Sequence, residues 1–318
     1  MAFAGVLPRV ADLGDVARLI RGLSWPTTLG LAALAAANLV TYPLLSMASL
    51  PGLRFRPAFV VTQASTAVAN TVPAGGGVSI GVTYAMYAGY GLDRTAIVLS
   101  ITTTGIANVA VKLAMPAVAA ALVALDGDAP SWVWRAAQLG LALTAALAVV
   151  VGIVLNERRP ATAAVRTGAR LLARVRRRDP AHEAEAALRR LSLVRRDALT
   201  LVGLRGTVLL VAAVVSHVAL YSLFAACLAA VEVRLPLAVS FAVFSVVRLG
   251  LAVPVTPGGV GVAEAGYAAA LVAAGATAEP AVAAVLLFRA ASYLLPLPVG
   301  LVSWLAWRRR PRPSATSP

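Results

Sequence analysis

The chain alternates long apolar runs with short polar turns, and this pattern predicts helices that cross a membrane. A helix needs about 20 mostly apolar residues to cross a hydrocarbon core of about 30 Å. Two apolar runs, residues 58–92 and 237–275, are each interrupted near the middle by proline and glycine. We therefore predict an all-α polytopic membrane protein with about seven or eight membrane segments. The uninterrupted runs that are long enough to cross are residues 25–50, 94–125, 131–155, 206–231 and 281–307.

The second interruption is the most informative stretch of the chain. It contains Pro257, Gly258, Gly259 and Gly261, and Glu264 follows shortly after it. Proline removes a backbone donor and glycine permits non-helical angles, so the helix is expected to break here. In hydrocarbon a broken backbone is tolerated only where protein buries it or where it lines a wet cavity. An ionisable residue at such depth indicates a functional site, and the alternative is a packing break with a neutral Glu264.

The first interruption has the same composition, with Pro73, Gly75 and Gly77 between two apolar pieces. Each piece has roughly 15 residues, or about 22 Å of helix, which is shorter than the membrane core. We therefore predict a re-entrant hairpin here, and a second one at residues 237–275.

Basic residues predict the orientation of the chain. Residues 156–205 hold thirteen arginines, and residues 308–318 form a second basic segment. Lysine and arginine are enriched in cytoplasmic loops, so both segments are expected in the cytoplasm. Residues 156–205 form either a helix along the anionic headgroups or a solvated basic loop. The prediction is one transmembrane domain whose halves, residues 1–155 and 206–307, flank that loop.

The two halves resemble each other when they are offset by 184 residues. This offset places Pro73 on Pro257 and Gly75 on Gly259, and it aligns Gly77 with Gly261 in the same way. Each half then consists of a span, a broken hairpin and a span, with opposite orientation. Such inverted repeats occur in many secondary transporters, where the broken helices form the substrate site near the midplane.

Charged residues at membrane depth suggest what that site binds. Three cations, Lys112, Arg248 and Arg289, accompany one carboxylate, Glu264. Intramembrane charges pair or face a cavity, so one ion pair leaves surplus positive charge that suits a phosphodiester. Arginine favours bidentate phosphate contacts, whereas lysine acts as a point charge. The alternative is that Arg248 and Arg289 extend to an interface.

Polar side chains near the breaks are further candidates. Asn70 and Asn108 are assigned to the substrate site, although such residues often serve only as hydrogen bonds between helices. His217 and Cys227 are interpreted as packing residues.

Composition narrows the remaining possibilities. Of 318 residues 60% are hydrophobic, and the mean hydropathy is +0.84. We assign the net charge of +15 to topology and anionic lipid rather than to nucleic acid. A single cysteine excludes an intramolecular disulfide, and two histidines provide almost no ligands for a metal or haem. No cofactor is expected.

The stretch Pro-Gly-Gly-Val-Gly-Val-Ala-Glu-Ala at residues 257–265, followed by Gly275, resembles the lysylphosphatidylglycerol synthase transmembrane family. The stretch Asn-Thr-Val-Pro-Ala-Gly-Gly-Gly at residues 70–77 is similar to the matching motif of the first hairpin. The resemblance implies a flippase-type fold with about eight membrane segments and two re-entrant hairpins. Many relatives carry an arginine just after the first break, where this chain has Ile80 and Gly81.

The resemblance also bears on activity. In two-domain relatives this region moves an aminoacylated phosphatidylglycerol that an attached soluble domain makes. The segment after Trp307 is too short for such a domain, so no enzymatic activity is expected. An intramembrane enzyme is also disfavoured because Glu264 has no second carboxylate or histidine motif beside it.

We predict a plasma-membrane translocator of an anionic phospholipid or a lipid-linked intermediate. The alternative is a membrane protein that does not transport but presents a lipid carrier to a separate glycosyl- or aminoacyl-transferase. The expected partners are membrane lipids, with such a transferase or a second copy of the chain as protein partners.

Overall fold

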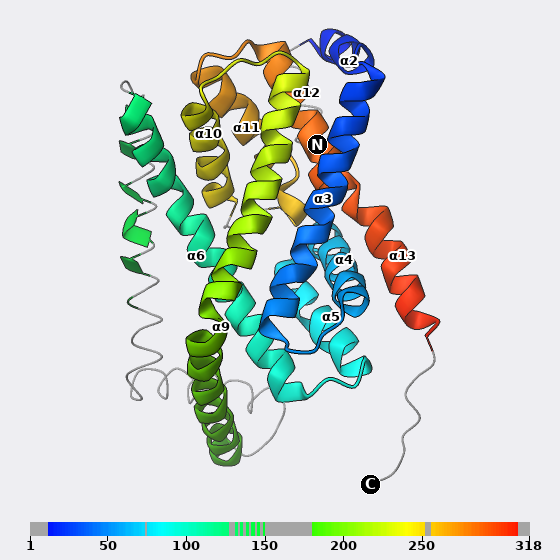
Figure 1. The fold of residues 1–318 in the computed structure, drawn as a ribbon, viewed down its shortest axis with the longest axis vertical. Helices are drawn as coiled ribbons and strands as arrows, with labels where there is room; N and C mark the ends of the chain where they lie inside the picture. Colours follow the sequence, from blue (N-terminus) through cyan, green and yellow to red (C-terminus); the bar gives the residue numbers. More distant parts are fainter. Residues whose placement is uncertain are drawn as a thin grey trace.

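The computed structural model describes residues 12–73, 75–126, 180–251 and 256–310, together with scattered positions between 131 and 149. Within these residues the regular elements are all helical (Figure 1). In chain order they are α2 (Leu13–Arg21), α3 (Trp25–Ser49), α4 (Phe55–Thr71), α5 (Gly75–Gly89), α6 (Arg94–Asp126), α9 (Pro180–Ala230), α10 (Leu237–Gly250), the 3₁₀ turn η2 (Pro257–Gly259), α11 (Val262–Ala273), α12 (Ala278–Arg289), the π-helical turn η3 (Ala290–Leu294) and α13 (Pro296–Arg308).

Four helical segments of the described chain are long and apolar enough to cross a membrane. They are Trp25–Ser49, Arg94–Leu125, Arg205–Ala230 and Ala278–Arg308. These segments agree with four of the five uninterrupted spans that the sequence predicts. The fifth, at residues 131–155, lies largely outside the described residues.

The first hairpin consists of α4 and α5. Helix α4 ends at Thr71, and α5 begins at Gly75, so the interruption falls on Pro73 and its neighbours. A side chain at Gly75 would bring its Cβ within 2.3 Å of the carbonyl oxygen of Ala69, so only glycine fits this close approach. Gly77 was expected in the break but lies inside α5, because the helix resumes as soon as Gly75 has made the turn.

The second hairpin consists of α10 and α11, with η2 between them. Helix α11 begins at Val262, three residues later than the 184-residue offset from Gly75 places its start. The two breaks therefore differ locally although their sequences align. In Figure 1, α4 and α5 lie in the lower half of the bundle, and α10 and α11 lie in the upper half.

Helix α9 differs most from the prediction. It runs without interruption from Pro180 to Ala230, so residues 180–205 are a helical extension of the following span. Neither a loop nor a separate helix along the headgroups describes this half of the basic segment. The physical reason is that residues 181–202 contain no glycine or proline and are rich in alanine, leucine and arginine, which favour helix. Residues 156–179 lie outside the described chain.

The predicted last span contains a feature that the sequence did not indicate. Helices α12 and α13 are joined by η3, a π-helical turn at residues 290–294. Such turns are rare and occur often at functional sites. The turn comes directly after Arg289, the last residue of α12.

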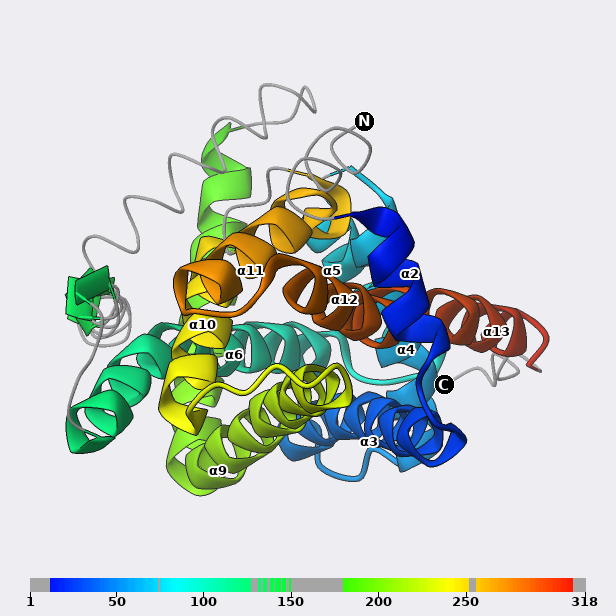
Figure 2. The same cartoon turned by 90° about the horizontal axis from the view of Figure 1, so that it is seen from above.

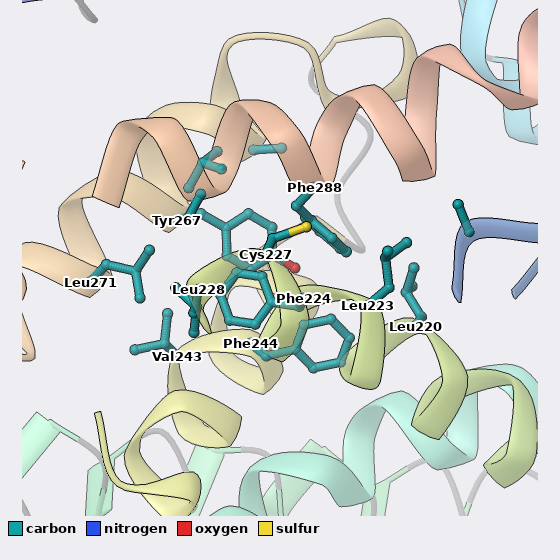
Figure 3. Packing of buried hydrophobic residues seen from close by; sticks show 14 of the residues in the cluster. Leu220, Leu223, Phe224, Cys227, Leu228, Val243, Phe244, Tyr267, Leu271 and Phe288 are labelled. Carbon is teal, nitrogen blue, oxygen red and sulfur yellow. The ribbon is translucent and has the colours of Figure 1, made fainter. Parts of the chain in front are cut away.

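Aromatic side chains hold the second hairpin to the spans (Figure 3). Phe224 of α9 lies 5.2 Å, between ring centroids, from both Tyr267 of α11 and Phe288 of α12. Phe244 of α10 lies 5.6 Å from Phe224. Edge and tilted ring contacts add to the burial of apolar area, so this cluster fixes four helices relative to one another.

The first hairpin is held by α3 and α13 (Figure 2). The buried Gln63 of α4 donates a hydrogen bond from Nε2 to the carbonyl oxygen of Leu39 in α3, at 2.9 Å. Gly300 of α13 packs against α4 so closely that a Cβ there would lie 2.4 Å from the Cβ of Ala67. Close backbone approach through small residues is a common way for helices to associate in membranes.

This packing predicts that Gly300→Ala is destabilising. We expect the free energy of unfolding to fall by about 1–3 kcal/mol, because the added methyl group overpacks the contact with α4. Thermal unfolding in detergent measures the effect. Gly81→Ala is the matched control, since a Cβ at Gly81 meets nothing within 4 Å. Equal stability of the two variants would contradict the close packing of α4 and α13.

Candidate functional site

The second break places left-handed backbone next to the start of a helix. Gly258, Gly259 and Gly261 have φ angles of 59°, 69° and 84°, which glycine adopts without steric cost. Gly261 is the N-cap of α11. The first N–H groups of a helix have no partner inside the helix, so this break exposes donors and carbonyls that other groups must satisfy.

Glu264 satisfies the donor side of the break. It lies in the first turn of α11, and its side chain is only 3% exposed. Its Oε2 accepts a hydrogen bond from the backbone N–H of Gly261 at 2.5 Å. A carboxylate in this position stabilises a helix both by capping an N–H group and by its interaction with the helix dipole.

Arg289 donates hydrogen bonds both to the carboxylate of Glu264 and to a backbone carbonyl of the break. Its Nε donates to Oε1 of Glu264 at 2.6 Å, and its Nη2 donates to the carbonyl oxygen of Gly258 at 3.0 Å. The arginine side chain is 13% exposed. One ion pair therefore provides hydrogen-bond partners for both a backbone N–H group and a backbone carbonyl group at the broken helix. Of the two arginines that the sequence offers as partners, Arg248 and Arg289, the structure pairs Glu264 with Arg289.

Tyr293 connects this ion pair to the first hairpin. The guanidinium carbon of Arg289 lies 4.2 Å from the centroid of the Tyr293 ring, and the hydroxyl of Tyr293 donates to the carbonyl oxygen of Asn70 at 3.0 Å. A Cβ at Gly258 would lie 2.2 Å from the same ring and 3.0 Å from the Asn70 oxygen. The two breaks therefore meet at Tyr293, which the turn η3 carries.

Arg248 and Lys112 take no part in this ion pair. They are on α10 and α6. The guanidinium of Arg248 lies 5.5 Å from the centroid of the Phe244 ring. Asn108 is four residues before Lys112, so the two share one face of α6. The structure thus brings together Glu264, Arg289 and the Asn70 carbonyl, whereas among the described residues no hydrogen bond or ion pair joins Arg248, Lys112 or Asn108 to them.

Sequence reasoning missed Tyr293 and the way in which Asn70 takes part. Tyr293 is four residues after Arg289, and this spacing places an aromatic ring next to a guanidinium on one helix face. That signal was available in the sequence. Asn70 contributes its backbone oxygen at the end of α4, a role that its side chain does not reveal.

The described residues contain no group of three or more histidine, cysteine, aspartate or glutamate side chains that could hold a metal ion. The chemistry available at the junction is therefore the binding of charge by an arginine, a carboxylate and helix ends. An arginine guanidinium has five N–H donors, and within the described part of the chain Arg289 engages groups through Nε and Nη2 only.

The fold and the site define a multi-pass helical membrane protein with a buried ion pair where two broken helices meet. A family model described as "Lysylphosphatidylglycerol synthase TM region" matches residues 1–300. The chain belongs to this family. A comparison with curated proteins finds no match.

The geometry predicts that Glu264 is required for stability. We expect Glu264→Ala to lower the free energy of unfolding by about 3–5 kcal/mol, because it leaves a buried arginine unpaired. Glu264→Gln is expected to lose less, since its amide oxygen can still accept a hydrogen bond. Thermal unfolding in detergent is the measurement.

The matched control is Glu232→Gln, which removes an exposed carboxylate. Surface substitutions of this kind usually change stability by less than about 0.5 kcal/mol. If Glu264→Ala unfolds at the same temperature as this control, the ion pair does not stabilise the junction.

Proposed function

We propose that the protein translocates an anionic phospholipid, or a lipid-linked intermediate with a phosphodiester, across the plasma membrane. The observation that carries the proposal is the meeting of two broken hairpins at the buried Glu264–Arg289 pair. In transporters with broken helices, the substrate site is formed by helix ends near the bilayer midplane. The family and the apolar spans support a membrane role, and the junction supports a charged substrate.

The proposed mechanism is an exchange of anions on Arg289. In the resting site the guanidinium binds the carboxylate of Glu264 and the carbonyl of Gly258. A lipid phosphate offers the same guanidinium two oxygens in a matching geometry. When the phosphate replaces the carboxylate, Glu264 still caps Gly261, and the ion pair that joins α12 to α11 is released. This release would let the two hairpins move relative to each other.

The proposed arrangement in the membrane is an inverted repeat. Residues 156–205 and the C-terminus are placed in the cytoplasm by their arginines. Near the C-terminus, Arg310 lies over the rings of Tyr90 and Trp307, at 3.8 and 5.2 Å from their centroids. Aromatic residues of this kind are enriched at membrane interfaces, which supports an interfacial position for the end of α13. In this arrangement the first hairpin enters from the cytoplasm and the second from the opposite side.

A transport measurement tests the proposal. In liposomes that contain fluorescent phosphatidylglycerol, the protein is expected to make lipid of the inner leaflet accessible to dithionite. Arg289→Gln is expected to slow this movement roughly 10- to 100-fold, because a hydrogen bond to a charged group contributes about 1.5–3 kcal/mol. Arg234→Gln, which removes an exposed arginine, is the matched control and is expected to behave as the parent.

If the parent protein leaves the inner leaflet protected, the proposed translocation is wrong. Binding of the lipid without movement would instead favour a protein that presents a lipid carrier to a separate transferase.

A second prediction concerns the direction of the hairpins. In a Cys227→Ser background, single cysteines at Pro73 and Pro257 are expected to react with impermeant thiol reagents from opposite sides of the membrane. Both positions are exposed at the breaks, whereas Cys227 is buried. Reaction of both cysteines from one side only would contradict the inverted repeat.

A further inference from the structure

A cleft opens on the side of the bundle between α6, α9 and α10, which pack against one another (Figure 2). Its volume is about 390 Å³, which is within the range of sites for small organic ligands. The described side chains that line it are apolar, with Ala114 of α6, Val214 of α9 and Phe241 of α10 among them. The one exception among these described residues is His217 of α9.

The cleft opens toward the lipid rather than toward water. Val118, Val214 and Val218 line it, and they are 50%, 41% and 54% exposed. They belong to the segments Arg94–Leu125 and Arg205–Ala230, which are long and apolar enough to cross a membrane. Exposed apolar side chains in such segments contact the hydrocarbon tails of the bilayer. A ligand of this cleft therefore enters it from the bilayer and is itself largely apolar.

His217 gives the apolar cleft one polar group that lacks a partner. The residue is 6% exposed, and its Nδ1 lies 2.9 Å from the carbonyl oxygen of Ala213. A carbonyl only accepts, so Nδ1 carries the hydrogen, and Nε2 of the uncharged ring is an acceptor. Nε2 is buried, and no described group donates a hydrogen bond to it. Buried polar atoms are nearly always hydrogen-bonded, so this exception indicates a ligand that supplies a donor.

The depth of His217 limits what kind of donor the ligand carries. His217 is the thirteenth of the 26 residues of the segment Arg205–Ala230, so it lies near the middle of the span. A charged or zwitterionic headgroup at this depth requires counter-charges. The described lining contains no lysine, arginine, aspartate or glutamate. A single hydroxyl group is neutral, and one acceptor such as Nε2 satisfies its hydrogen.

We infer that this cleft binds a neutral lipid alcohol, which is a molecule with a long hydrocarbon chain and one free hydroxyl group. The hydroxyl donates to Nε2 of His217, and the chain lies along the apolar wall that includes Ala114 and Val214. Neither Glu264 nor Arg289 is among the described lining residues. The inference goes beyond the proposed function, because the ligand is uncharged and binds whether or not the protein moves an anionic lipid.

The experiment is photolabelling of the full chain in phosphatidylcholine liposomes. The probe is hexadecanol with a diazirine in its chain, and the matched probe is the methyl ether of the same alcohol, which lacks the donor. Labelled peptides are mapped by mass spectrometry. We expect the alcohol to label residues 110–118 of α6 and 210–218 of α9 roughly 3- to 10-fold more than the ether, because one hydrogen bond contributes about this much to binding.

Three variants accompany this test. His217→Phe keeps an aromatic ring and removes the acceptor, so the alcohol and the ether are expected to label it equally. Ala114→Phe fills the cleft and is expected to reduce labelling by both probes. Ala33→Phe changes an exposed alanine of α3 outside the described lining, and it is the matched control that is expected to label as the parent does. Thermal unfolding shows that the variants fold, and the comparison of the two probes on the parent requires no variant.

Four outcomes would overturn the inference. Equal labelling of the parent by the alcohol and the ether would mean that His217 does not bind the hydroxyl. Equal labelling by phosphatidylcholine with the same diazirine chain would mean that the cleft takes up any bilayer lipid. A His217→Phe variant that keeps the preference for the alcohol would mean that the hydroxyl is bound elsewhere. Absence of labels from both peptides would mean that the cleft is closed to the bilayer, and a dimer in size-exclusion chromatography would then identify a second copy as its cover.

The outcomes also separate this inference from the proposed function. A protein that moves phosphatidylglycerol but shows no preference for the alcohol would contradict the inferred site alone. A protein that the alcohol labels in the cleft but that does not move phosphatidylglycerol would contradict the translocation alone.

Discussion

The ion pair between Glu264 and Arg289 is the interaction on which the centre of this molecule depends. A broken helix in hydrocarbon leaves donors on one side and acceptors on the other, and no water is available to satisfy them. Here the carboxylate caps the N–H of Gly261, and the guanidinium binds the carbonyl of Gly258. Their contact at 2.6 Å joins the two caps. Truncation of either residue alone to alanine leaves the partner's charge unpaired and a backbone group of the break unsatisfied.

The same constraint explains the neighbouring structure. Arg289 reaches the break because it ends α12, and the π-helical turn that follows carries Tyr293 back to the carbonyl of Asn70. The ring of Tyr293 packs directly against Gly258, where a side chain would collide with it. The first and second hairpins are thereby connected through one tyrosine. Exchange of the Glu264 carboxylate for a lipid phosphate on Arg289 is expected to alter this connection. This is the proposed part of the ion pair in transport.

The sequence predicted these features to the extent that they depend on local chemistry. Proline and glycine interrupt helices wherever they cluster, so both breaks could be located, and a carboxylate in an apolar run identified Glu264 as unusual. The partner of Glu264 could not be chosen between Arg248 and Arg289, because that choice depends on how α10 and α12 pack. The turn η3 has no local signal, since Ala-Ala-Ser-Tyr-Leu also suits an α-helix. The polarity of residues 181–205 predicts that the helix begins only near residue 206, whereas helix propensity continues through the arginines and α9 begins at Pro180.

The charges inside the bundle show a further limit of sequence reasoning. Their pairing depends on how the helices pack, which local patterns do not reveal. The structure thus separates two sets of charges. Glu264 neutralises Arg289 at the second break, whereas among the described residues the ion pairs involve neither Arg248 nor Lys112.

The most direct test of this account is a double-mutant cycle on the ion pair, measured in the absence and presence of anionic lipid. Thermal unfolding of the parent, Glu264→Gln, Arg289→Gln and the double variant gives the coupling energy between the two side chains. Without anionic lipid we expect a coupling of about 1–3 kcal/mol, as for other residues in direct contact. With saturating phosphatidylglycerol the coupling is expected to fall toward zero, because the phosphate replaces the carboxylate on Arg289. A coupling that is unchanged by the lipid would contradict the account and leave the ion pair a purely structural contact.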